Sequence, residues 1–310
     1  MADTITALQG YMAGIFRSPG VVVGASTVHN MAVNGTFADG ATTSWTETLG
    51  AGGSLTVADG YGRNNYGYGL RIVDGGASAK TGIDQTITLA SAITATEALS
   101  YHICLSGWVK FAATGKTATM KVSALSVADA VLGTDTVAIK SNNIYYGDTN
   151  WGYFSVWTDA IVATKKVKIE IYSDTAGATQ TLYVDDIQCV IVDQCAGAYG
   201  DMTLNDNVEI IDATTFATST NAFRTTLPTM HNLATVALTS YFTTSEIMAA
   251  KMYADTKFFC TIFSQRGTKT SDRFEFWGRI SGANFATPLA GIQQENVIIT
   301  VDGVIGQADI

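Results

Sequence analysis

The residues with the clearest chemical potential lie in one glycine-rich loop. Residues 61–68 read Tyr-Gly-Arg-Asn-Asn-Tyr-Gly-Tyr, so aromatic rings alternate with amide and guanidinium groups. Aromatic rings stack on the apolar face of a pyranose, and the polar groups hydrogen-bond its hydroxyls. The loop therefore predicts a site that binds a sugar. The candidate contacts are Tyr61, Arg63, Asn64, Tyr66 and Tyr68 in the loop, with His102, Trp108 and Tyr172 on the polar faces of predicted strands.

The alternative is that these aromatic rings pack in a core or at its rim, and that the segment is only a spacer. For Trp45 and Trp151 we expect packing. Sugar binding and packing would both need a folded β domain around the loop.

No residue pattern in the sequence is typical of catalysis. His29, His102 and His231 lie far apart, and Gly60-Tyr61-Gly62 lacks the Lys-Ser/Thr of a phosphate-binding loop. Asp185 and Asp186 are adjacent, so a regular strand would point them to opposite faces and prevent joint acid–base action. We expect no enzymatic activity and no required cofactor.

Composition excludes several other classes of function. The formal net charge is −9 and charged residues make up 15% of the 310, so the chain lacks the basic surface that holds nucleic acid. No apolar run is long enough to span a membrane, and no export signal is readable at the N-terminus. We expect a protein made in a cytoplasm. Its cysteines should be free buried thiols, with a Cys189–Cys195 bridge as the alternative.

Period-two alternation predicts the elements that position these residues. In 101–111 the odd positions are mostly apolar, whereas the even positions carry His102, Ser106, Trp108 and Lys110. Residues 167–172 and 119–124 alternate in the same way. Two antiparallel sheets packed face to face would bury one side of every run and leave Trp108 on the other side.

The order of motifs in this part resembles the galactose-binding-like jelly rolls found as carbohydrate-binding modules. The matching pieces are Asn34-Gly35-Thr36-Phe37, Trp45, Gly69-Leu70-Arg71-Ile72, 106–110, Asn150-Trp151-Gly152 and Tyr183-Val184-Asp185-Asp186. The resemblance implies a structural calcium near the first and last strands. Its candidate ligands are Asp39, Asp185 and Asp186, although Ala38 stands where the family usually has an acidic residue.

The flanks carry a different pattern. Thr243 and Glu246 have capping-box spacing, which predicts one short helix through Tyr253. Predicted strands cover 233–239, 257–263, 273–280 and 295–303. The strand into Asp212-Ala213-Thr214-Thr215-Phe216, the turn Arg224–Pro228, the helix and the long strands resemble the tail tube (major tail) proteins of long-tailed bacteriophages.

The two resemblances together imply an all-β fold with one short helix. Residues 1–29 and 193–310 would form a discontinuous β-barrel domain of the tail-tube type, interrupted by a carbohydrate-binding-like β-sandwich at 30–192. Subunits would close into hexameric rings that stack with other tail proteins and conduct DNA without gripping it. The predicted subunit or ring contacts are Arg17, Pro19, Phe216, Arg224, Leu227 and Pro228.

The implied location is the virion, assembled in the host cytoplasm, with the sandwich facing outward toward a host-surface carbohydrate and no membrane partner. Two alternatives stay open. One is a surface or secreted glycan-binding module, and the other is a capsid decoration or head fibre protein.

Overall fold

The computed structural model describes most of the chain. The described residues are 15–63, 67–76, 79–143, 147–148, 150–173, 179–196, 199–205, 208–212, 226–231, 235–241, 257–263, 273–286, 294–302 and 305–308. The predicted helix at 243–253 and the residues Asn64, Tyr66, Phe216 and Arg224 lie outside them.

The chain divides into two compact units. The first contains Met1–Gln194, Thr261–Glu275 and Gly306–Ile310, and the second contains Cys195–Cys260 and Phe276–Ile305. The break after Gln194 lies close to the predicted boundary at 192, whereas residues 15–29 fall in the first unit. The two units are defined only by contacts within the chain. They do not test the predicted division into a tail-tube domain and an insert, which stays a prediction.

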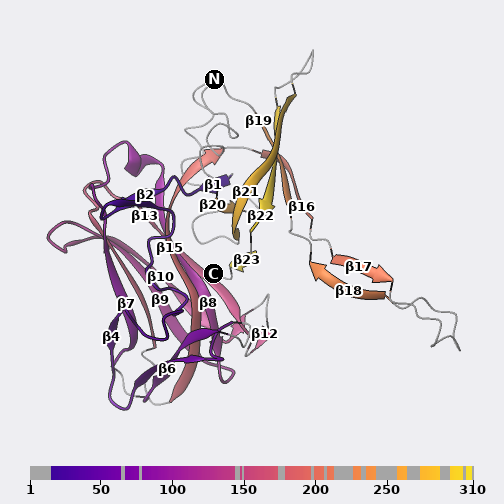
Figure 1. Cartoon of the computed structure of the whole chain (residues 1–310). Helices are drawn as coiled ribbons and strands as arrows, with labels where there is room; N and C mark the ends of the chain where they lie inside the picture. The colour runs from indigo at the N-terminus through magenta and orange to yellow at the C-terminus, as the bar shows by residue number, and fades with distance from the viewer. Residues whose placement is uncertain are drawn as a thin grey trace, which may run out of the picture. The chain divides into compact units, whose positions relative to one another are not determined.

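Two antiparallel sheets packed face to face form most of the first unit (Figure 1). The five-stranded sheet has the order β10 (Val131–Lys140), β9 (Thr117–Leu125), β14 (Lys166–Ser173), β7 (Thr81–Thr88) and β4 (Thr46–Thr48). The facing sheet contains β13 (Gly152–Asp159), β8 (Tyr101–Phe111), β15 (Gln180–Ala196), β6 (Tyr68–Asp74) and β5 (Ser54–Asp59). The predicted β-sandwich is confirmed.

Smaller elements complete the first unit. They are the strand β1 (Ile15–Arg17), which follows β15 in the sheet order, the hairpin of β2 (Val21–Val23) and β3 (Ser26–Val28), the 3₁₀ turn η1 (Glu97–Leu99), the pair β11 (Asn142–Asn143) and β12 (Gly147–Asp148), and β23 (Gly306–Ala308). Within the described residues, no helix has the length and apolar character needed to cross a membrane.

The alternating strands bury the side predicted from the sequence. Ile103, Leu105, Val109 and Phe111 of β8 join Ile169 and its neighbours of β14 in one apolar core. The Asn34-Gly35 motif closes this core against the last strand, because Ile187 N donates to Gly35 O at 3.0 Å. A Cβ at Gly35 would clash with the Ile187 carbonyl, so only glycine permits this approach.

The second unit contains most of the remaining antiparallel strands, which follow β1 and β20 in the same sheet order. Their order is β21 (Arg273–Ala286), β22 (Gln294–Val301), β19 (Thr235–Tyr241) and β16 (Tyr199–Asn205), and β20 (Phe258–Phe263) and β21 each have residues in both units. The strands β17 (Val208–Asp212) and β18 (Thr226–His231) pair with each other as a two-stranded sheet. The all-β prediction is thus confirmed over the described chain.

One predicted turn is wrong. Leu227 and Pro228 lie in β18, paired with Ile211 and Ile210 of β17. Proline has no N–H for a strand ladder, and the register shift between Glu209 and Ile210 beside it interrupts the regular pairing there. Arg17 ends β1 and Pro19 follows it. Whether these residues make subunit contacts stays a prediction.

Candidate functional site

The outer face of the β8 sheet places polar and aromatic side chains in rows across its strands. Tyr183 of β15 pairs with Arg71 of β6 on one side and with Lys110 of β8 on the other. Gly152 of β13 pairs with Val109, so Trp151, one residue earlier, extends this row. Directly opposed residues of neighbouring strands have Cβ atoms about 5 Å apart, so the row forms one continuous surface.

A groove of about 600 Å³ lies over this row. Its aromatic lining comes from Tyr61, Trp151 and Tyr183, all half-buried, and its polar lining includes Lys110 and Asn150. The rings of Tyr61 and Tyr183 meet edge to face, with centroids 5.3 Å apart. Gly69 lets the Tyr61 loop approach β6, because a Cβ there would clash with the Tyr61 carbonyl. The groove thus combines exposed ring surface with hydrogen-bonding groups.

The next row of the same face is covered rather than open. Trp108 was predicted to be presented among polar groups, but its ring is only 7% exposed. The Arg63 guanidinium lies 4.7 Å from the Trp108 ring centroid, and Tyr153 packs edge-on at 5.2 Å. The prediction that Trp108 is an open platform is wrong because the Tyr61 loop folds over it through Arg63.

Further along this face, a buried ion pair covers side chains of β13. Glu275 accepts hydrogen bonds from Tyr153 Oη at 2.7 Å, Ser155 Oγ at 2.7 Å and Trp157 Nε1 at 3.0 Å. Arg273 Nε donates to Glu275 at 2.6 Å, and both side chains are fully buried. Burial and then the charge of Glu275 raise the pKa of Tyr153 well above its usual range. This part of the face is therefore interior.

His102, Tyr172 and Tyr68, also predicted to contact sugar, lie elsewhere. His102 contacts Asp159 at 3.2 Å, at the far end of the face covered by Glu275. Tyr172 is on the opposite sheet, with Lys80 Nζ 3.9 Å from its ring centroid. Tyr68 is exposed and does not line the groove. Among the described residues that were expected to contact sugar, Tyr61 lines the groove, and Arg63 lies behind the loop that carries Tyr61.

The predicted calcium ligands have protein partners, and the calcium site stays a prediction. Asp185 accepts from the backbone N–H groups of Arg63 and Asp186 at 2.8 Å each, and Asp186 pairs with Arg63 Nε at 3.1 Å. Asp39 accepts instead from Asn34 Nδ2 at 2.8 Å and Ala41 N at 3.0 Å. Among the described residues, no group of three or more His, Cys, Asp or Glu side chains could hold a metal ion. The Arg63 guanidinium supplies a positive charge to Asp186, where the resemblance implies calcium.

The Asp185–Asp186 geometry corrects a second prediction. A β-bulge between Asp185 and Gln188, with Asp186 at φ 51°, brings both carboxylates to Arg63 instead of to opposite faces. Burial raises the pKa of Asp185 to about 6, and the neighbouring charge of Asp186 adds to this shift. Asp185 therefore acts as a buried acceptor that holds the loop.

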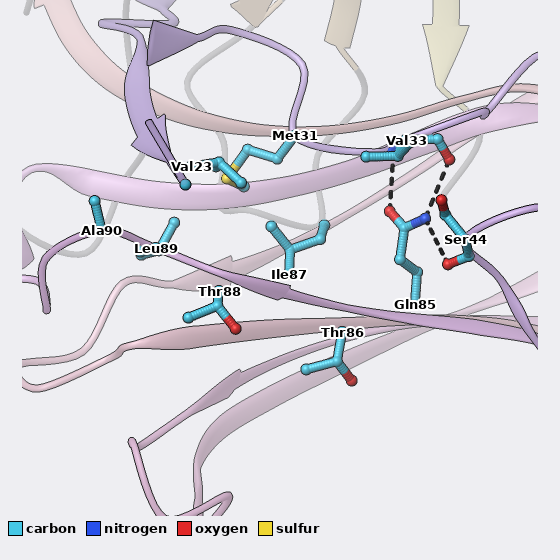
Figure 2. Close-up of a pocket in the computed structure, with 11 residues that line it drawn as sticks. Val23, Met31, Val33, Ser44, Gln85, Thr86, Ile87, Thr88, Leu89 and Ala90 are labelled. Carbon is cyan, nitrogen blue, oxygen red and sulfur yellow. Dashed lines mark hydrogen bonds between the residues drawn. The ribbon is translucent and has the colours of Figure 1, made fainter. Parts of the chain in front are cut away.

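A second hollow, of about 440 Å³, lies beside β7 (Figure 2). Its walls are aliphatic, chiefly Val23, Met31, Ile87 and Leu89. The Gln85 carboxamide is fully engaged there, with hydrogen bonds of 3.0–3.1 Å to Val33 and Ser44. The described residues that line this hollow include no aromatic ring and no charged group, so they lack the features of a sugar site.

The cysteines follow the prediction where they are described. Cys104 and Cys189 are buried free thiols, which excludes the alternative Cys189–Cys195 bridge, and Cys260 is also buried. Burial, followed by the charge of Glu275, raises the pKa of the Cys104 thiol well above its usual range.

Sequence reasoning missed most of the groove. Trp151 was assigned to packing, and Tyr183 was noted only within a family motif. One signal could have found them. Lys110 and Tyr183 both lie on the polar side of alternating strands, and a paired register would have placed them together.

Comparisons with known proteins give structural matches only. No family model matches the chain, and no curated protein matches it. Part of the tailspike protein 4 enzymatically active domain of bacteriophage CBA120 matches with a TM-score of 0.40 and 12% identity, over 52% of this chain and 21% of that one.

Two binding modules match over nearly their whole length. A family 16 carbohydrate-binding module has a TM-score of 0.35 and 18% identity, over 52% of this chain and 99% of that one. TmCBM61, solved in complex with β-1,4-galactotriose, has a TM-score of 0.35 and 13% identity, over 52% and 98%. The matched proteins thus include carbohydrate-binding modules and a phage tailspike, and none of those named here is a tail tube protein.

Proposed function

We propose that the first unit is a glycan-binding module and that its site is the groove over Tyr183. The observation that carries the proposal is the meeting of three half-buried aromatic rings, Tyr61, Trp151 and Tyr183, around hydrogen-bonding groups in one groove. Half-buried rings keep a free face for a pyranose while packing fixes their orientation, so little ordering entropy is lost on binding.

The groove binds without cleaving its ligand in this proposal. Glycoside hydrolysis uses two facing carboxyl groups about 5–10 Å apart. Among the described residues, those that line the groove include Lys110 but no Asp or Glu. A ligand that enters the groove would be held by stacking and hydrogen bonds and released unchanged.

The test is a glycan array followed by calorimetric titration of the full chain. Tyr183→Ala should weaken binding by about tenfold or more, because it removes a stacking surface worth roughly 1.5 kcal/mol. Tyr172→Ala is the matched control, since that ring lies on the opposite sheet, and it should bind like the wild type. A Tyr183→Ala protein that is folded and binds equally well would overturn the proposed site.

The assignment of the flanks to a phage tail tube is a second, separate proposal. In its favour, β19, β21 and β22 follow the strand order that the resemblance implies. Negative-stain microscopy should reveal rings or tubes with the sandwich on the outside. A chain that stays monomeric with and without tail initiator proteins would contradict this role and favour a free-standing surface module.

A further inference from the structure

We propose that the groove selects acidic glycans, with Lys110 receiving a uronate carboxylate. This inference rests on the proposed glycan-binding function and adds the class of ligand. Its basis is a difference between the two sheets of the first unit in how their charged side chains are paired.

On the five-stranded sheet, a cluster of lysines is paired with carboxylates. Glu170 lies 2.9 Å from Lys121 Nζ, 3.5 Å from Lys80 Nζ and 3.7 Å from Lys168 Nζ. Asp84 adds a second contact to Lys168 at 3.5 Å. These three lysines therefore have little attraction left for an anion.

On the groove face, the cations next to Tyr183 have no carboxylate partner among the described residues. Lys110 is half-buried in the groove lining, and no described residue accepts a hydrogen bond or forms an ion pair with its ammonium. Arg71 lies 5.5 Å from the Tyr61 ring centroid, and its buried Nε has no hydrogen-bond partner among the described residues. In a chain of net charge −9, two cations in one row without a described carboxylate partner make this part of the groove face locally positive.

The row also fixes the geometry of recognition. Arg71, Tyr183 and Lys110 occupy consecutive strands, so the two cations flank the stacking ring at about two strand spacings, roughly 10 Å apart. A uronate residue stacked on Tyr183 presents its C6 carboxylate at the edge of its ring, within reach of a flanking lysine. The carboxylate would replace water on Lys110 Nζ with a charge-assisted hydrogen bond.

The experiment titrates the full chain with hexasaccharides of galacturonate, guluronate and glucuronate, and with the methyl ester of each. The ester keeps the sugar backbone and removes the charge. At least one acid should bind about tenfold more tightly than its ester, as expected for one hydrogen bond to a charged group. The preference should shrink as NaCl is raised from 0.05 to 0.5 M, since screening weakens the attraction.

Lys110→Met should abolish the preference for the acid, and Lys110→Arg should retain it. Lys140→Met is the matched control, because this exposed lysine ends β10 on the other sheet, and it should leave the preference unchanged. Far-UV and near-UV circular dichroism establish that each variant is folded, and Lys110→Gln replaces the Met variant if that one is not.

Three other results are distinguishable. Equal binding of acids and esters, lost in Tyr183→Ala, would overturn the acidic preference and leave the glycan site intact. A preference that survives in folded Lys110→Met and Lys110→Gln would overturn the role of Lys110. Failure of the whole neutral and acidic panel to bind would overturn the proposed function together with this inference.

Discussion

At the scale of single residues, Arg63 organises the loop that bears Tyr61. Its backbone N–H and its guanidinium are held by Asp185 and Asp186, and its guanidinium covers Trp108. A cation in this position satisfies two carboxylates that the sequence assigned to calcium. We therefore expect chelators to leave both the loop and the proposed glycan binding unchanged.

Asp185 should make stability depend on pH. Its pKa is raised from 3.8 to about 6 in the folded state, chiefly by burial, so between these values the folded protein binds a proton that the unfolded chain does not. The contribution of Asp185 to the free energy of unfolding should thus fall as the pH rises from 4 to about 6 and stay low above it. Relative to the wild type, Asp185→Asn should gain about 2 kcal/mol between pH 4 and pH 8.

Urea unfolding at a series of pH values measures this difference. Asp59→Asn, which makes the same change of a carboxyl to an amide at an exposed position of β5, is the control. A difference for Asp185→Asn that is flat across this range would contradict the raised pKa.

At the scale of elements, the alternating strands were readable from the sequence and their covering partners were not. The core sides of β8, β9 and β14 follow directly from period two, because burying one face is the main free-energy gain of a strand. The polar side of β8 is covered by Arg273 and Glu275, more than a hundred residues later in the chain. Trp108 on the same side is covered by Arg63 of the Tyr61 loop. Neither contact follows from a local sequence pattern, and that is why the sequence predicts an open Trp108.

The bulge at Asp186 shows a related limit. Strand periodicity assigns adjacent carboxylates to opposite faces, but one residue in the left-handed region changes the direction of the side chains that follow. Tyr61, by contrast, was found from its loop alone, because its chemistry and its position in a glycine-rich turn were both visible in the sequence.

The Arg273–Glu275 pair should anchor its segment to the sandwich. Glu275→Gln leaves a buried guanidinium without its counter-charge, so the first unit should lose about 3 kcal/mol of stability. Replacing both residues, with Arg273→Met and Glu275→Gln, should cost less than the single change, since no buried charge then remains unpaired and the amide carbonyl at position 275 still accepts from the neighbouring donors.

Denaturant unfolding of the full chain measures both variants. Glu47→Gln, an exposed glutamate on β4, is the control and should change stability little. If Glu275→Gln unfolds at the wild-type denaturant concentration, the hydrogen-bond network around Glu275 does not stabilise the fold.

At the scale of the whole molecule, the sequence placed a β-sandwich after residue 30 and a change of pattern near residue 193, and the break after Gln194 lies close to the second of these. The sequence did not indicate that residues 261–275 and 306–310 belong to the first unit. A chain that returns twice to an earlier unit relies on contacts between distant segments, and periodicity carries no information about them.

The most direct test of the glycan site is fluorine NMR of the full chain labelled with 5-fluorotryptophan. Trp45, Trp108 and Trp157 are buried, whereas Trp151 lines the groove. Titration with a bound oligosaccharide should shift the Trp151 resonance, identified by its loss in Trp151→Phe, and leave the three buried resonances in place. Saturable binding that leaves the Trp151 resonance unmoved would contradict the account.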